Sequence, residues 1–427
     1  MKVGVLGGGL SGLVVAGHAK HDCEVLEAND RTGGHCRSLV EDGYTFDIGG
    51  PHILFSKNKE VLGYVLEQLG DNVAERKRNN KVFLDGKYVK YPFENGLADL
   101  EPEDRFECLY HYLNNDHPKP ANFKEWIYHT FGSGIAEKYM IPYNEKIWNT
   151  PAEEMALDWV EGRIPKPPAE DVIKSAVGVD TEGYTHQLYF NYPIEGGIEA
   201  LIKAFEKKCP SITTNFRVSE VRRDEGRWRI GDGAGERVFD KLISTIPIQD
   251  LIAALPDVPE DIVERTAALK FNSLVTVMLG AACAEPPPYL ALYVPGGDYP
   301  FHRLSFPLTF TPNGAPAGCM AVMAEITTNP GDGVHELGDG EITDRVVEGI
   351  EHMGLIEPAA INFKRVSRAR YAYVVRTFDY RENLEKVLAY LDGLGITSLG
   401  RNAQFEYINM DEAVRRALVA AEALDGG

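Results

Sequence analysis

The sequence predicts an α/β protein in which a discontinuous domain with a parallel sheet carries a small inserted helical domain and a mostly antiparallel β-sheet domain. Three observations predict this class. The N-terminus alternates strand, glycine turn, helix and strand, the second half is rich in short strand candidates, and a strand near the C-terminus precedes a helix. Alternating strands and helices are typical of a parallel sheet, whereas runs of strands indicate an antiparallel one. The 427 residues, 44% of them apolar, provide for two or three domains with substantial cores.

The first elements are a strand over Lys2–Leu6 and a helix over Leu10–Lys20, joined by a glycine turn. Gly7, Gly9 and Gly12 match the spacing G-x-G-x-x-G. In this pattern the first glycine permits a sharp turn, the second lets the backbone approach a pyrophosphate, and the third lets the helix pack closely on the strand. The N-terminus of the helix would then face the phosphate charge.

The second strand, Cys23–Leu26, ends at Glu27, about 20 residues beyond the first glycine, where a carboxylate is expected to bind ribose hydroxyls. Gly33, Gly34 and the hydroxyl of Ser38 extend the pattern. A secretory signal is the alternative for an apolar N-terminal run, but the glycines would interrupt its apolar segment and the carboxylate would have no role. We therefore expect a Rossmann-like dinucleotide-binding domain.

The later elements agree with the predicted class. An Asp-Gly pair between two short strands is a strong hairpin signal, and an aspartate before a helix is a common N-cap. The expected elements are a helix over Lys57–Leu69, a hairpin of Lys81–Leu84 and Lys87–Lys90, helices within 97–154, strands over Arg217–Val221, Arg227–Ile230, Asp240–Ile246, Leu269–Leu279, Leu290–Val294, Arg303–Thr309, Ala321–Thr327 and Gly395–Gly400, and a helix over Asp411–Leu424 capped by Asp411.

Each predicted domain is given by its segments. Residues 1–75, 196–262 and 376–427 form the Rossmann-like domain, residues 97–154 the helical domain, and residues 76–96, 155–195 and 263–375 the antiparallel sheet domain with the substrate site.

Charge and composition limit the partners. A formal net charge of −20 argues against nucleic acid as a ligand and makes any arginine in a pocket informative, because an anionic substrate needs local positive charge. No apolar run approaches the length of a membrane span, so we expect no stable membrane insertion and a cytoplasmic location. The six cysteines lack C-x-x-C spacing, which favours buried thiols in a reducing compartment, and the eleven histidines suggest no metal site.

The extended glycine pattern of residues 27–38 is similar to that of the large FAD family of amine oxidases, protoporphyrinogen oxidases and UDP-galactopyranose mutases. Shorter segments resemble the UDP-galactopyranose mutases in particular: the histidine loop Ile48–Phe55, Tyr91–Asn95, Pro142–Trp148, Trp159–Arg163, Tyr299–Phe306, Leu399–Arg401 and Phe405–Asp411. The sequence departs from the bacterial pattern at Asn409, where an aspartate is usual, at Val374, where a proline often stands, and over Leu54–Ser56. These departures concern the sugar end of the pocket.

The resemblance implies FAD as cofactor. The residues that it places at FAD are Gly7, Gly9, Leu10, Ser11, Gly12, Glu27, Ala28, Gly33, Gly34, His35, Gly50, His52, Val218, Gly400, Arg401, Met410 and Asp411. For His52 a structural role of a glycine-flanked histidine stays open, as does an ordinary capped helix for Asp411.

The resemblance also implies a nucleotide-sugar substrate. Arg163 and Arg303 would hold its pyrophosphate as catalytic residues, and His52 would adjust the flavin. Two arginines suit a diphosphate because each guanidinium presents a planar fork of donors, although a plain surface arginine is the alternative for Arg163. The remaining substrate contacts implied are Tyr143, Trp148, Tyr192, Tyr373, Tyr407 and Asn409.

The implied reaction interconverts UDP-galactopyranose and UDP-galactofuranose, or a related nucleotide sugar, in cell wall polysaccharide biosynthesis. It is redox-neutral but requires reduced FAD, proceeds through an adduct between flavin N5 and the sugar, and needs NAD(P)H or another reductant. Two alternatives remain. An amine oxidase or protoporphyrinogen oxidase-like enzyme predicts an apolar tunnel and no paired arginines, and a flavin-binding scaffold predicts no turnover. The sugar, the reductant and the oligomeric state, including a homodimer, stay open.

Overall fold

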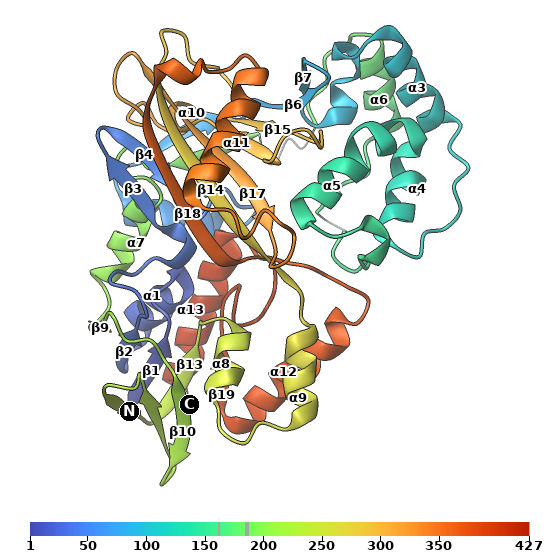
Figure 1. Ribbon diagram of the computed structural model, residues 1–427. Helices are drawn as coiled ribbons and strands as arrows, with labels where there is room; N and C mark the ends of the chain where they lie inside the picture. Colours follow the sequence, from blue (N-terminus) through green and yellow to red (C-terminus); the bar gives the residue numbers. More distant parts are fainter. Residues whose placement is uncertain (161–162, 184–187, 427) are drawn as a thin grey trace.

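A five-stranded parallel sheet forms the base of the molecule, in a computed structural model that describes residues 1–160, 163–183 and 188–426. Its order is β19 (Ile396–Ser398), β13 (Lys241–Ser244), β1 (Lys2–Leu6), β2 (Asp22–Leu26) and β9 (Ser211–Thr213). Every neighbouring pair is parallel, and Figure 1 shows how segments from the two ends and the middle of the chain meet in this sheet. The predicted α/β class, with parallel and antiparallel sheets, is confirmed.

Both faces of the parallel sheet are covered, which explains the continuous apolar runs of its strands. On one face Val3 and Val5 pack with α1 (Leu10–His18) and the C-terminal α13 (Met410–Gly426). On the other face Leu6 packs with residues of the other covering elements. These are β10 (Glu220–Asp224), β11 (Arg227–Gly231), β12 (Glu236–Phe239), α8 (Ile248–Ala254), α9 (Glu260–Ala268) and α12 (Tyr380–Leu394).

A seven-stranded sheet stands above the parallel sheet (Figure 1). Its neighbours are antiparallel except for the parallel pair β15 and β6. The order is β18 (Ile361–Val374), β14 (Phe271–Ala282), β17 (Cys319–Thr328), β16 (Arg303–Ser305), β15 (Ala291–Tyr293), β6 (Asn80–Leu84) and β7 (Lys87–Lys90). Helix α11 (Asp339–His352) packs on it through buried apolar side chains.

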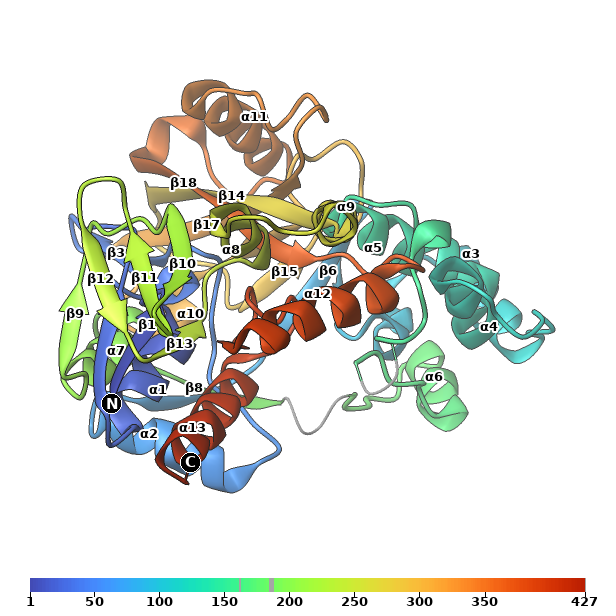
Figure 2. The same ribbon diagram turned by 90° about the horizontal axis from the view of Figure 1, so that it is seen from below.

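The helical part lies to one side of both sheets, as Figures 1 and 2 show. It contains α3 (Pro102–Leu113), α4 (Phe123–Ile135), a π-helical turn (Ala136–Met140) and α5 (Ile141–Trp148). Helix α6 (Ala169–Ala176), which follows the predicted end of the helical domain at residue 154, also packs against α3. The domain boundaries stay predictions.

Small elements complete the frame around the site. The hairpin β3 (Ser38–Glu41) and β4 (Tyr44–Asp47), the pair β5 (Ala74–Lys77) and β8 (Tyr189–Tyr192), and the helices α2 (Lys59–Leu69) and α7 (Glu199–Glu206) pack beside the N-terminal core.

Several predicted element ends were wrong. The strand expected over Arg303–Thr309 ends at Ser305, because Pro307 begins the short helix α10 (Pro307–Phe310). The strand expected from Arg217 begins only at Glu220. Helix α13 begins at Met410, so Asp411 lies inside its first turn instead of capping it. Strand β18 was not predicted; its outer half is exposed and charged and therefore lacks an apolar run.

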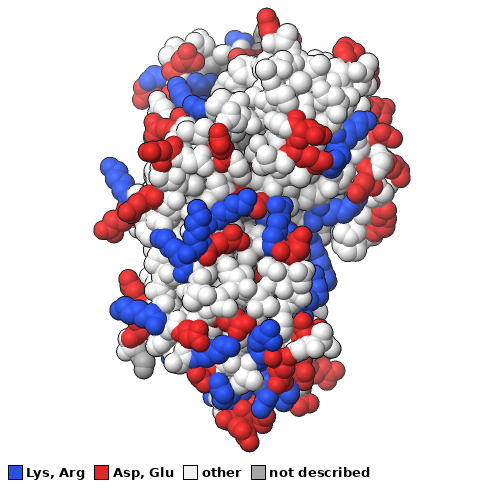
Figure 3. Space-filling view, turned by 90° about the vertical axis from the view of Figure 1, so that its left-hand side faces the viewer, with Lys and Arg blue, Asp and Glu red and all other residues white. Residues whose placement is uncertain are grey.

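The surface mixes both signs of charge. Figure 3 shows basic side chains gathered across the middle of one face with acidic ones interspersed, so the net charge of −20 does not make this face uniformly acidic. In the described part of the chain, no helix is long and apolar enough to cross a membrane. Nor do the described residues contain a group of three or more His, Cys, Asp or Glu that could hold a metal ion.

Candidate functional site

A cavity of about 1180 Å³ lies where the two large sheets face each other. Its lower wall consists of the turns that follow the carboxyl ends of four parallel strands: residues 7–11 after β1, 27–29 after β2, 245–247 after β13 and 399–402 after β19. Ligands of open α/β sheets bind at this edge. The upper wall comes from β15, β16 and β18 of the antiparallel sheet.

The glycine turn has the geometry that a dinucleotide requires. Gly7 has a φ of +98°, and a Cβ on Gly12 would lie 2.1 Å from the Gly7 carbonyl oxygen, so these two glycines make the turn and the close packing possible. A Cβ on Gly9 would meet no atom within 4 Å. On Gly34 it would approach only the Cα of Gly9, at 3.5 Å. Gly9 and Gly34 therefore leave a bare channel at the N-terminus of α1, into which a pyrophosphate fits.

Glu27 lies at the rim of this channel and also holds the turn. Its carboxylate accepts hydrogen bonds from the backbone N–H groups of Gly8 (2.8 Å) and Asn29 (2.9 Å). The side-chain amide of Asn29 also donates to this carboxylate, at 2.5 Å. A carboxylate has about four acceptor sites, so one remains for a ribose hydroxyl. The donors and the space around the glycines therefore fit the adenosine diphosphate part of FAD.

The histidine loop lies between the two sheets. Gly50 has a φ of +84°, and a Cβ there would lie 2.8 Å from a carboxylate oxygen of Glu325 in β17. His52 donates from Nδ1 to the Gly50 carbonyl (2.7 Å). Burial, together with Arg401 and Arg303, lowers the pKa of His52 to about 4 despite that hydrogen bond. The imidazole is therefore neutral at neutral pH.

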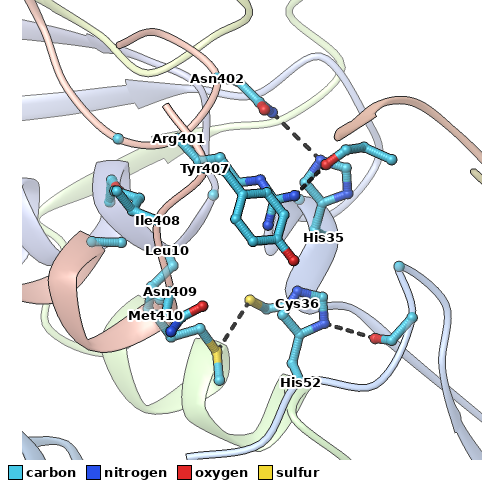
Figure 4. A pocket seen from close by; sticks show the side chains of 18 of the residues that line it. Leu10, His35, Cys36, His52, Arg401, Asn402, Tyr407, Ile408, Asn409 and Met410 are labelled. Carbon is cyan, nitrogen blue, oxygen red and sulfur yellow. Dashed lines mark hydrogen bonds between the residues drawn. The ribbon is translucent and has the colours of Figure 1, made fainter. Parts of the chain in front are cut away.

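His35 is the second histidine of the pocket and lies on the same side of it as His52 (Figure 4). Burial, and then the charge of Arg401 and the proximity of His52, lower its pKa to about 3. Its Nε2 lies 3.4 Å from Nδ2 of Asn402. With both histidines neutral, the arginines supply the positive charge of this end of the cavity.

Two of these arginines contact the ring of Tyr407. The guanidinium carbon of Arg163 lies 3.8 Å from the ring centroid, and that of Arg401 lies 4.1 Å away. Arg163 also donates to the Tyr407 carbonyl oxygen at 2.9 Å, and Arg401 donates to the carbonyl oxygen of Ala372. Within the described part of the chain, neither guanidinium is paired with a carboxylate. Residues 161–162, in the segment that suggested Arg163, lie outside the described residues.

Arg303 is arranged differently from the sequence-based expectation. Its Nε and Nη2 donate to the two carboxylate oxygens of Glu325 at 2.6 and 2.5 Å, and the Glu325 side chain is fully buried. Burial opposes the charge of Arg303, but the carboxylate outweighs it and raises its pKa. Two of the donors of Arg303 are therefore used within the protein and Nη1 is left for a ligand, so its contact with a pyrophosphate stays a prediction. The sequence signal for Glu325 was a lone carboxylate within an apolar strand.

Four predicted residues do not line the cavity. Tyr143 packs behind it against Tyr293, with ring centroids 5.3 Å apart, and Trp148 packs against Tyr407 at 5.8 Å. They support the wall of the cavity from behind, and their contact with a substrate stays a prediction. Gly12 is covered by the first turn. Tyr192 is buried beneath the histidine loop, where its hydroxyl donates to Asp47 at 2.9 Å.

The remaining predicted positions line the cavity: Gly7, Gly9, Leu10, Ser11, Glu27, Ala28, Gly33, Gly34, His35, Gly50, His52, Arg163, Val218, Arg303, Tyr373, Gly400, Arg401, Tyr407, Asn409, Met410 and Asp411. Asp411 also accepts a hydrogen bond from Ser56 at 2.5 Å, which joins α13 to the histidine loop. Whether each of these residues binds a ligand stays a prediction.

The wall contains further residues that the sequence did not single out. Tyr293 lies beside Tyr91, with ring centroids 4.7 Å apart, and accepts a hydrogen bond from Asn80 at 3.1 Å. Arg78 lies over the ring of Phe55 at 5.0 Å. Only the strand prediction over residues 290–294 pointed toward Tyr293, and no pattern marked Arg78.

The comparisons with known proteins agree with this architecture. The profile of the flavin containing amine oxidoreductase family matches residues 10–424. The structure of a reduced UDP-galactopyranose mutase is similar over 100% of this chain and 95% of that chain, with a TM-score of 0.91 and 25% identity.

Two further structures share the fold. One, assigned to a protoporphyrinogen oxidase from Exiguobacterium sp. 255-15, has a TM-score of 0.76 and 19% identity over 99% of this chain and 98% of that chain. A putrescine oxidase variant has a TM-score of 0.66 and 16% identity over 100% of this chain and 99% of that chain.

A curated relative matches only a short stretch. The uncharacterized protein in the nifH2 3′ region of Methanothermococcus thermolithotrophicus is 54% identical over 52 residues, which are 12% of this chain. The chain spans about half the length of this relative, 50%.

Proposed function

The chain belongs to the family of flavin-containing amine oxidoreductases, and we propose that within this family it is a flavin-dependent mutase of nucleotide sugars. The reaction proposed is the interconversion of UDP-galactopyranose and UDP-galactofuranose, or of a closely related pair, with reduced FAD and no net redox change. The similarity to a reduced UDP-galactopyranose mutase over the full chain supports this proposal.

The observation that carries the proposal is the pair of guanidinium groups around Tyr407. Arg163 and Arg401 lie in the same cavity as the glycine channel and have no carboxylate partner among the described residues. Uncompensated charges in a cavity are unfavourable unless a ligand of opposite sign binds there. On a chain of net charge −20 such a cluster favours an anionic substrate, and planar guanidinium forks suit the paired oxygens of a diphosphate.

The residues of the cavity then take distinct roles. Arg163 and Arg401 bind the diphosphate and stabilise the charge that develops when it leaves the sugar, an effect worth about 3 to 4 kcal/mol per donor in comparable sites. Arg303, fixed by Glu325, presents its remaining Nη1. Tyr373 and Tyr407 restrict the position of the substrate. The reduced flavin, when bound, supplies the nucleophile for the anomeric carbon.

An amine oxidase activity fits this cavity poorly. An amine substrate is an ammonium ion at neutral pH, and two like charges 4 Å apart repel by about 4 kcal/mol at an effective dielectric constant of 20. Glu325, which is fully buried behind the wall, is already paired with Arg303. The site therefore disfavours cationic substrates while it attracts anionic ones.

The test uses the purified flavoprotein reduced with dithionite. We expect UDP-galactofuranose to be converted to UDP-galactopyranose, separated by chromatography, and no conversion by the oxidised protein. Arg163→Ala should abolish turnover while the flavin spectrum is retained. The matched control is Arg345→Ala, which removes an arginine from the exposed face of α11. Peroxide production from amines, without conversion of any nucleotide sugar, would refute the proposal.

A further inference from the structure

Tyr407 is held from several sides. Besides the guanidinium groups of Arg163 and Arg401, the ring of Tyr373 stacks on it with centroids 5.8 Å apart, and Trp148 contacts it edge-on at 5.8 Å. These residues come from β18, α5, the loop after β19 and the segment before α6. The orientation of the Tyr407 ring is therefore fixed by packing.

The hydroxyl of Tyr407 is directed into the cavity. Figure 4 shows the ring at the centre of the pocket, with its hydroxyl toward the side on which Cys36 and His52 lie. Among the described residues no side chain forms a hydrogen bond with this hydroxyl. A fixed phenol with an unpartnered hydroxyl is positioned to exchange a proton with a ligand.

The charges that face Tyr407 are mostly positive. Arg163, Arg401 and, from β16, Arg303 are cations that act on the phenol, and Glu325 of β17 is a carboxylate that acts on it. Glu406, the residue before Tyr407, is a second carboxylate of this cavity and lies near Arg376 and Arg416. Burial raises the pKa of Tyr407, but the three arginines outweigh burial and lower it below its ordinary value. The pKa of Tyr373, in the same cavity, is raised by burial instead.

We propose that Tyr407 is a proton-transfer residue whose protonation is coupled to anion binding in the cavity. The phenolate and a diphosphate compete for the guanidinium groups of Arg163 and Arg401. When the anion binds, it neutralises the charges that favour the phenolate, and the phenol takes up one proton from solvent. The anion therefore arrives together with a protonated Tyr407, and its release is accompanied by release of that proton.

The coupled proton suits the chemistry of a sugar ring, and here the inference rests on the proposed function. Opening of the ring places a proton on the ring oxygen, and closure through another hydroxyl removes one. Tyr407 can donate the first proton and accept the second, so that it returns to its starting state. No proton is consumed over a full turnover, and no oxidant or reductant takes part in this exchange.

The first test is a pH titration of the flavoprotein followed at the tyrosinate absorbance band. We expect one tyrosine to ionise at lower pH than the others in the wild-type protein, and this step to be absent from Tyr407→Phe. The control, Tyr373→Phe, should retain it. Arg163→Gln removes one cation and should shift the step upward by about one pH unit. If the step persists in Tyr407→Phe, the inference is wrong.

The second test measures proton uptake on binding. Calorimetric titrations with inorganic pyrophosphate and with UDP, in two buffers of different ionisation enthalpy, are carried out at the pH of the Tyr407 step. We expect uptake of a proton by the wild-type protein and none by Tyr407→Phe. Binding of UDP without proton uptake would overturn the inference and leave the proposed function intact. Uptake with pyrophosphate but no binding of UDP would support the inference and count against the proposed function.

Discussion

The buried ion pair of Arg303 and Glu325 allows a prediction of stability that separates a structural from a catalytic role. Two hydrogen bonds of 2.6 and 2.5 Å join the side chains, of which Glu325 is fully buried and Arg303 is 21% exposed. Removing one partner of a buried pair leaves an uncompensated charge and destabilises a protein by about 3 to 5 kcal/mol, whereas replacing both partners is often nearly neutral. Arg303→Met and Glu325→Gln should each show this loss, and the double variant should recover most of it.

The assay is urea unfolding of the flavoprotein at neutral pH, with a double-mutant cycle across the two positions. The matched control is the cycle of Arg345→Met and Glu341→Gln, an exposed pair one helical turn apart on α11. An exposed pair of this kind contributes about 0.3 to 0.5 kcal/mol, so its cycle should show almost no coupling. The coupling energy between Arg303 and Glu325 should exceed that of the control several-fold.

Additive losses at Arg303 and Glu325 would refute the reasoning, because they would show that neither charge depends on the other. Turnover of the double variant supplies the second readout. A stable double variant that no longer converts a nucleotide sugar would show that Arg303 contacts the substrate through its remaining Nη1. A stable and active double variant would show that the ion pair has only a structural role, which is to hold β16 against β17.

Four further variants test single features. Gly9→Val should keep the fold but lose flavin, because its side chain enters the open glycine channel; the measurement is the ratio of flavin to protein absorbance. Gly12→Val should instead lower the melting temperature of the protein, because its Cβ would lie 2.1 Å from the Gly7 carbonyl oxygen. Burial raises the pKa of Asp47 to about 6, so between about pH 4 and 6 the folded state binds more protons than the unfolded state. The stability of the wild type relative to Asp47→Asn should therefore fall over that range as pH rises, by on the order of 3 kcal/mol in urea unfolding. Tyr192→Phe should cost about 2 kcal/mol through its lost hydrogen bond to Asp47 and leave the UDP affinity in calorimetry unchanged.

The glycine channel was predictable because its chemistry is local. Gly7 and Gly9 are two residues apart, and Glu27 follows at the end of the next strand, so one βαβ unit determines their geometry. The hairpin at Asp85 and Gly86 was predictable for the same reason, and both residues adopt the positive φ that such a turn requires.

The pairing of Arg303 with Glu325 depends instead on strand register. The two residues are directly opposite each other in β16 and β17, and a shift of one residue would turn Glu325 to the other face of the sheet. The partner of Tyr192 could not be predicted from local sequence either, because its hydroxyl donates to Asp47, which is 145 residues away in the chain. The family resemblance suggested a ligand contact for each, whereas the fold gives each a hydrogen-bond partner within the protein.

Gly400 explains how the cofactor end and the substrate end of the cavity come together. It has a φ of +89°, and a Cβ there would lie 2.6 Å from the hydroxyl of Ser11 in the first turn of α1. The loop after β19 can therefore lie directly on the N-terminus of the helix that faces the glycine channel. Arg401 follows at once, and Tyr407 lies six residues later in the same loop, against its guanidinium group. A single backbone conformation thus places the cations for an anionic substrate beside the site for the flavin, so any larger residue at position 400 should impair binding of both ligands together.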